Sequence, residues 1–158
     1  MDPQTKTTKQ GLPIGWIVAV LLVALTWAGA HALRGDGDGT IMPGWADGIE
    51  AGQALAQDAD KPMVVLFTAG WCPPCKQLKK QVLTQGEVNK ALQAGFVPVQ
   101  IDLTDTSSSN PNLATAEHYG VQGIPAVIAM TPEGKTIEVY RGGPDSAGFM
   151  DWLNRLAK

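Results

Sequence analysis

A pair of cysteines separated by two prolines constrains the fold of this chain more than any other feature. Cys72 and Cys75 are its only cysteines, so a scaffold held by several disulfides and a four-thiolate zinc site are both excluded. The pair follows residues 63–68, a short and almost wholly apolar run that is typical of a strand buried on both faces. Residues 76–83 have helical spacing, so the pair lies where a buried strand turns into a helix.

This position predicts redox chemistry for the two thiols. The N-terminus of a helix favours an anion and lowers the pKa of a thiol there, so we expect Cys72 to be the nucleophile. Cys75, one turn deeper, reaches the Cys72 sulfur and is the expected resolving thiol of a dithiol–disulfide couple. Pro73 and Pro74 suit the first helical turn, whose N–H groups have no partner within the helix. Neither is a cation that would stabilise the thiolate further, which favours a reductase over an oxidant.

Two other uses of the cysteines stay open at this point. They could form a static structural disulfide, or they could bind a soft metal such as Cu(I) or Zn²⁺. A metal needs further ligands, and the chain after the pair has one histidine, His118, expected on the surface of a short helix. We therefore expect no metal at this site and keep copper delivery as the second hypothesis.

Composition excludes several other functions. The formal net charge of −3 gives no basic surface for nucleic acid, and 158 residues give room for one compact domain with an appendage. The chain has no Gly-x-Gly-x-x-Gly fingerprint of a dinucleotide site. We expect no cofactor and infer that electrons come from a partner protein.

The N-terminal part predicts a membrane anchor. Residues 12–33 contain no Asp, Glu, Lys or Arg and are long enough to cross a bilayer as a helix. Lys6 and Lys9 precede this stretch and Arg34 alone follows closely, which places residues 1–11 in the cytoplasm. The rest of the chain then faces the periplasm or the outside of a single-pass inner-membrane protein. The alternative is a signal peptide cleaved near Ala30-His31-Ala32, which would release the domain.

After the anchor, residues 34–44 are rich in Gly, Asp and Pro and predict a flexible linker. Residues 45–158 then predict one α/β domain with a mixed central sheet flanked by helices. The expected order of its elements is a helix at 45–60, a strand at 63–68, helices at 76–83 and 87–94 broken near Gly86, a strand at 96–103, a loop at 104–112, a helix at 113–119, an antiparallel pair of strands at 126–130 and 136–141, and a helix at 146–156.

Three separated motifs make residues 45–158 resemble the thioredoxin superfamily, in particular its membrane-tethered or exported bacterial thiol:disulfide interchange members. They are Phe67 to Lys76, which contains Trp-Cys-Pro-Pro-Cys; Tyr119 to Pro125; and Gly142 before the last helix. The resemblance implies a thioredoxin fold in which Pro125 follows a cis peptide bond beside the cysteines. It also implies that Ile124 offers backbone groups to an extended substrate, and that Trp71, Ile124 and Gly142 form an apolar docking surface.

One position departs from that family. Many thioredoxins have a buried carboxylate where this chain has Leu66, so the acceptor of the Cys75 proton is open; water or a carboxylate such as Glu50 are the candidates. The resemblance implies a thiol:disulfide oxidoreductase that acts on exported proteins, and we expect it to act as a reductase, with a membrane or soluble thiol protein as electron donor. A disulfide oxidase or isomerase and a non-catalytic adaptor are the further alternatives.

Overall fold

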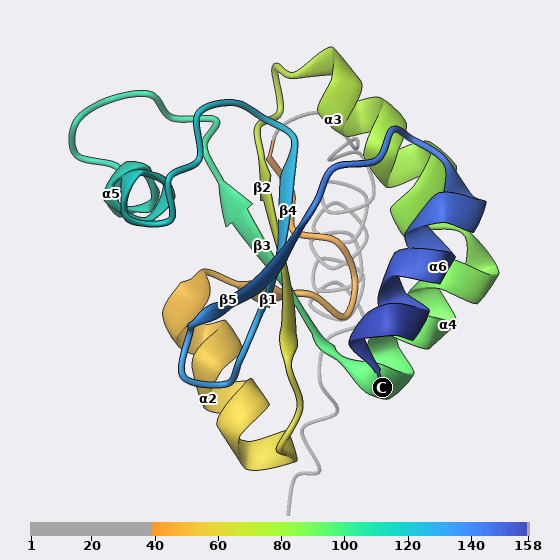
Figure 1. Cartoon of the computed structure of the whole chain (residues 1–158). Helices are drawn as coiled ribbons and strands as arrows, with labels where there is room; N and C mark the ends of the chain where they lie inside the picture. Colours follow the sequence, from red (N-terminus) through yellow and green to blue (C-terminus); the bar gives the residue numbers. More distant parts are fainter. Residues whose placement is uncertain (1–38, 158) are drawn as a thin grey trace, which may run out of the picture. The chain divides into compact units, whose positions relative to one another are not determined.

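Within residues 39–157, the part of the chain that the computed structural model describes, five strands form one mixed sheet in the order β1-β3-β2-β4-β5 (Figure 1). β3 runs parallel to β1 and β2, whereas β4 is antiparallel to both β2 and β5. The strands are β1 (Ala46–Asp47), β2 (Met63–Thr68), β3 (Val97–Asp102), β4 (Ala126–Met130) and β5 (Thr136–Tyr140). The predicted mixed sheet is therefore confirmed.

The central strand is β2, which ends four residues before the first cysteine. All six of its residues are buried, as the unbroken apolar run predicted for a strand covered on both faces. Because side chains alternate across a strand, Val64 and Leu66 pack into one layer, and Met63, Val65 and Phe67 into the other.

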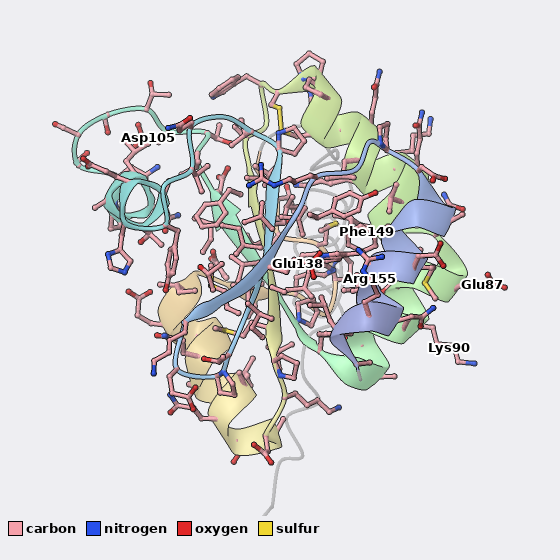
Figure 2. The ribbon with its side chains drawn as sticks, in the orientation of Figure 1. Glu87, Lys90, Asp105, Glu138, Phe149 and Arg155 are labelled. Atoms are coloured by element: carbon pink, nitrogen blue, oxygen red, sulfur yellow. A yellow bond between two sulfur atoms is a disulfide. The ribbon has the colours of Figure 1, made fainter. Side chains whose placement is uncertain are left out.

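Helices cover both faces of the sheet, and Figure 1 shows the two layers on either side of the strands. One layer has α2 (Ile49–Ala59) and α5 (Pro111–His118). The other has α3 (Pro73–Leu78), a π-helical turn η1 (Lys79–Leu83), α4 (Gly86–Gly95) and α6 (Ser146–Leu156). Phe149 of α6 points into this second layer (Figure 2), where it is fully buried.

The predicted helix at 45–60 is wrong in its first four residues. Ala46 and Asp47 form the short edge strand β1 opposite Val99 and Gln100 of β3, and α2 begins at Ile49. Gly48 separates the two elements with φ of 88°, a left-handed value that glycine adopts without a steric penalty. A search for helical spacing of apolar residues does not detect a two-residue strand, because so short a segment has no periodicity.

Two other helices begin earlier than the spacing predicted. The helix expected from its spacing at residue 76 starts at Pro73 with Cys72 as its N-cap, which agrees with the predicted fit of Pro73 and Pro74 to the first helical turn. The helix expected from residue 113 starts at Pro111, where the Asn110 side chain accepts a hydrogen bond from the N–H of Asn112. Pro111, which the sequence analysis assigned to the loop at 104–112, occupies the first helical position. The expected break near Gly86 is confirmed by the end of η1 at Leu83.

Part of the predicted linker is attached to the domain. Gln100 of β3 is fully buried, and its Nε2 donates to the carbonyl oxygens of Gly39 at 3.3 Å and Thr40 at 3.1 Å. Its Oε1 accepts from the N–H of Met42 at 3.4 Å. These three bonds hold residues 39–42 against the sheet, so this end of residues 34–44 is not a free tether.

The predicted cytoplasmic segment 1–11, the predicted span 12–33 and the rest of the linker lie outside the described residues. Among residues 39–157, no helix is long and apolar enough to pass through a bilayer.

Candidate active site

The two cysteines form a disulfide at the junction of β2 and α3, seen as a yellow bond beside the top of α3 in Figure 2. Their Cα atoms are 5.3 Å apart and the S–S distance is 2.09 Å. Cys72 is 3% exposed and Cys75 is 1% exposed, so both cysteines are buried in the disulfide form. Their assignment as attacking and resolving thiols stays a prediction.

Cys72 caps the helix that follows it. Its backbone is extended, with φ of −92°, and its Sγ accepts a hydrogen bond from the N–H of Cys75 at 3.3 Å. A sulfur in this position occupies the place of an N-cap oxygen and faces the unpaired N–H groups of the first turn. In the reduced protein the same N–H group stabilises a thiolate on Cys72, and the helix dipole adds to that effect.

The peptide bond between Ile124 and Pro125 is cis, as the resemblance implied. The carbonyl oxygen of Ile124 lies 3.8 Å from Cys72 Sγ, which places this loop directly beside the disulfide. Pro125 also lines a small pocket of about 160 Å³ together with Pro74 and Gly142. The structure therefore brings together residues of three separate segments that the sequence singled out, while their part in substrate binding stays a prediction.

Trp71 lies on the surface next to the disulfide, with 57% of its area exposed. Its Nε1 donates to the carbonyl oxygen of Thr104 at 3.1 Å. The Thr104 hydroxyl accepts from the N–H of Gly70 at 2.7 Å and donates to the Asp102 carboxylate. Thr104 thus fixes both residues that precede Cys72.

Sequence reasoning missed Asp102 and Thr104. Asp102 is the last residue of β3 and falls in the expected strand 96–103, whereas Thr104 opens the expected loop 104–112; both lie more than 25 residues after the cysteines. One signal was available: β3 is parallel to β2, so its carboxyl end lies at the same edge of the sheet as the cysteine pair.

The position of Leu66 is consistent with the departure noted in the sequence. Leu66 is fully buried in the layer that contains Leu78 and Val127, so no carboxylate occupies this site. Glu50 lies in the first turn of α2. Burial, and secondarily the negative charge of Glu50, raise the pKa of Tyr119 above its ordinary value. A role of Glu50 toward Cys75 remains an untested prediction.

His118 is exposed near the end of α5, as predicted, and its ring meets that of Tyr119 edge to face at 4.9 Å between centroids. Within residues 39–157 no three His, Cys, Asp or Glu side chains gather into a set of metal ligands. A metal held by Cys72 and Cys75 would therefore need further ligands from outside residues 39–157.

The chain is similar to known proteins in this region. A family model described as a thioredoxin-like domain matches residues 49–157. The thiol:disulfide interchange protein DsbD of Actinobacillus pleuropneumoniae is 27% identical over 164 aligned residues, which cover 98% of this chain and 27% of that protein. DsbD 1 of Pseudomonas aeruginosa is 32% identical over 111 residues, or 69% of this chain and 18% of that protein. The chain thus spans about a quarter or less of these relatives.

A solved structure supports the same relationship. The C-terminal domain of Neisseria meningitidis DsbD in the oxidised form superposes with a TM-score of 0.57 at 28% sequence identity. The match covers 67% of this chain and 90% of that domain. The likeness therefore concerns the domain that carries the cysteines, and extends over nearly the whole of the solved domain.

Proposed function

Because this chain belongs to the thioredoxin-like family, we propose that it is a thiol:disulfide oxidoreductase that works through the Cys72–Cys75 couple. The observation that carries the proposal is the disulfide at a helix N-terminus, with Cys72 Sγ 3.8 Å from the carbonyl oxygen of Ile124, which precedes a cis proline. A static structural disulfide would have no need of the open pocket beside Pro125 or of an exposed indole next to Cys72.

The reaction proceeds by two thiol–disulfide exchanges. In the reduced chain, the Cys72 thiolate attacks one sulfur of a substrate disulfide, forms a mixed disulfide and releases the first substrate thiolate. Cys75 then loses its proton and attacks Cys72 Sγ, which restores the disulfide seen here and releases the second substrate thiolate. Two electrons pass from the chain to the substrate, and the reverse sequence oxidises a substrate dithiol.

We propose that the net direction is reduction. Pro73 and Pro74 occupy the two positions between the cysteines, so no cation there stabilises the reduced form selectively, as strong oxidants require. The resemblance to interchange proteins supports exported proteins as substrates and another thiol protein as the electron donor. Anchoring by residues 12–33, with the domain on the periplasmic or outer side, belongs to the same proposal.

Substrates are proposed to dock where the three segments meet. A substrate strand that passes Cys72 would meet the backbone carbonyl of Ile124, beside the pocket that Pro125 and Gly142 line. Trp71 flanks the sulfur on the other side with a mostly exposed ring. This surface is apolar enough to accept an unfolded segment of varied sequence.

Trapping the mixed disulfide tests the proposal. In the full chain, Cys75→Ser leaves Cys72 able to attack but removes the resolving thiol, so a covalent complex with a disulfide protein such as insulin should accumulate. Cys72→Ser is the control and should form none. If Cys75→Ser and Cys72→Ser behave alike, or if the wild-type chain does not reduce insulin, the proposed activity is wrong.

The direction of electron transfer between the chain and its substrate needs a separate measurement. Equilibrating the couple with glutathione gives its potential, and we expect a value near the roughly −270 mV of thioredoxin rather than the roughly −120 mV of a strong oxidant. A value at the oxidising end would overturn the reductase assignment and leave the oxidoreductase activity standing.

A further inference from the structure

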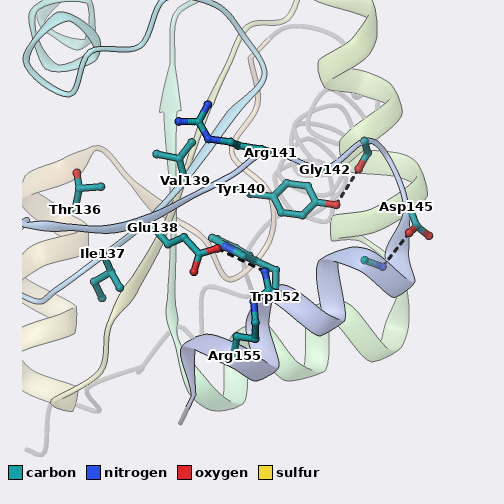
Figure 3. Close-up of a pocket in the computed structure, with 12 residues that line it drawn as sticks. Thr136, Ile137, Glu138, Val139, Tyr140, Arg141, Gly142, Asp145, Trp152 and Arg155 are labelled. Carbon is teal, nitrogen blue, oxygen red and sulfur yellow. Dashed lines mark hydrogen bonds and ion pairs between the residues drawn. The ribbon is translucent and has the colours of Figure 1, made fainter.

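A groove of about 620 Å³ runs along β5 and the facing side of α6 (Figure 3). β5 is the outer strand of the sheet, so it has a hydrogen-bonded neighbour, β4, on one side only. Ile137 of β5 is 50% exposed, one of three large apolar side chains among residues 39–157 that are at least half exposed. An outer strand with an exposed apolar side chain is a template for pairing with another strand.

The groove also contains a buried donor that has no acceptor. Trp152 of α6 is 1% exposed, and its Nε1 has no hydrogen-bond partner within the described part of the chain. The ring is held by Tyr140 and Phe149, whose centroids are each 5.3 Å away, so the direction of the N–H group is fixed. A buried indole N–H normally finds a partner, which points to a ligand that supplies one.

A weak ion pair lies at the same place. Glu138 and Arg155 approach to 3.5 Å, and Figure 3 shows them beside Trp152. Their side chains are 44% and 59% exposed, so the pair contributes little to stability and separates readily. Glu138, Arg155 and Trp152 all line the groove, so opening of the pair frees space next to the indole.

The groove is continuous with the pocket beside the disulfide. Tyr140, Gly142 and Gly143 line both, and the Tyr140 hydroxyl donates to the Gly143 carbonyl at 3.0 Å, which fixes the turn between them. From residue 142 back to residue 137, five steps along the chain span roughly 17 Å at about 3.3 Å per residue. A substrate segment of about eight residues, roughly 26 Å when extended, is therefore long enough to follow this part of β5 and continue past Gly142 into the pocket beside the disulfide.

We propose that this groove binds an extended segment of the same substrate protein whose disulfide is exchanged at Cys72, adding it to the sheet as a strand beside β5. One backbone carbonyl of the segment accepts the hydrogen bond from Trp152 Nε1. The inference rests on the proposed function and extends it, because it makes unfolded protein segments, rather than small disulfides, the preferred substrates.

A second copy of this chain fits the edge less well. Antiparallel pairing of two β5 strands about their middle residue would place Glu138 opposite Glu138, and like charges directly opposite one another destabilise a strand pair. A substrate segment carries no such fixed conflict.

Three mixed disulfides with thionitrobenzoate test the proposal in the reduced full chain. One contains glutathione, and two contain a cysteine peptide extended by eight residues on its amino or its carboxyl side. We expect one of the long peptides to react about tenfold faster than glutathione, as one or two additional backbone hydrogen bonds would give. Ile137→Asp should remove most of that gain and leave the glutathione rate within about twofold, because a charge on an outer strand blocks pairing.

Leu55→Asp is the matched control, since Leu55 of α2 is 53% exposed and lies on the opposite layer. It should leave all three rates unchanged. In the oxidised chain, a long peptide with serine in place of cysteine should shift the Trp152 indole N–H signal in a ¹⁵N–¹H spectrum, assigned through Trp152→Phe, and Ile137→Asp should abolish the shift.

The inference would be overturned by equal rates for long and short substrates, or by equal effects of Ile137→Asp and Leu55→Asp. It would also be overturned if sedimentation shows a concentration-dependent dimer that Ile137→Asp prevents. Failure of all three mixed disulfides to react would instead overturn the proposed oxidoreductase function, and this extension with it.

Discussion

Thr104 links the end of β3 to the two residues before Cys72, and replacing it with valine tests how much this link contributes. Thr104→Val keeps the shape of the side chain but removes the hydroxyl that accepts from Gly70 N–H at 2.7 Å and donates to Asp102. The Trp71 indole still has the Thr104 carbonyl as its acceptor, so any change in Trp71 reports altered backbone position rather than a deleted contact.

The expected loss of stability follows from the two bonds. A net hydrogen bond contributes about 1 kcal/mol, and a donor left unsatisfied in a buried site costs about 1–3 kcal/mol. Gly70 and Thr104 are half-buried, so water replaces part of the loss and we expect about 1.5 kcal/mol in total. With a denaturant slope of about 1.5 kcal/mol per molar urea, the unfolding midpoint of the full chain falls by about 1 M.

Urea unfolding and insulin reduction are the two measurements. Thr115→Val is the control, because the Thr115 hydroxyl bonds the Pro111 carbonyl within its own helix at 3.4 Å and water replaces it easily. Thr104→Ser should recover most of the lost stability and activity. Equal midpoints for Thr104→Val and Thr115→Val, or no recovery with serine, would refute the assigned role.

Three further perturbations follow from the described contacts. Gln100→Leu removes three bonds to residues 39–42 and should lower the free energy of unfolding by about 2–3 kcal/mol. Gln93→Leu, which loses two long and exposed bonds to Gly44 and Asn89, should cost under about 0.5 kcal/mol in the same urea titration. Gly52→Ala should destabilise the fold despite the better helix propensity of alanine, because its Cβ would lie 2.4 Å from Val99 Cγ2, while Gly95→Ala, with open space around it, should be neutral or stabilising by thermal melting. Both tyrosines, Tyr119 and Tyr140, should ionise above the ordinary pKa of 10.0, chiefly because burial raises their pKa and secondarily because of Glu50 and Asp145. The stability that this shift provides is complete below pH 10 and is lost as the pH rises through the folded-state values; ultraviolet titration of native and guanidinium-unfolded protein should show the difference, and coincident curves would contradict it.

The sequence predicted the elements whose signals are local. β2 and β4 have the predicted bounds, because a short apolar run between turn residues has few other interpretations. The C-terminal helix is also where its spacing placed it, with Phe149, Trp152 and Leu153 buried. The cysteine pair was recognisable for the same reason, since strand, motif and helix follow one another within 20 residues.

Elements defined by distant partners were not predictable in this way. Gln100 lies in a strand that is otherwise mostly apolar, and a hydrophobic pattern does not predict what a polar side chain in such a strand binds. Its partners at residues 39–42 are about 60 positions earlier in the chain. β1 exists because Ala46 and Asp47 meet β3, and their own sequence favours no strand. Such residues become visible only when the sheet order is known.

The same limit explains which residues of the site the sequence did not predict. Its chemistry lies in one segment, residues 71–75, but its surface is assembled where the strand ends converge: Thr104 follows β3, Pro125 precedes β4 and Gly142 follows β5. A motif search finds residues 71–75 directly, and the resemblance adds Pro125 and Gly142. Thr104 and Trp152 belong to no motif. Trp152 is counted as apolar in any hydrophobic pattern, so the feature that makes it informative, an N–H group buried without an acceptor, emerges from the packed structure alone.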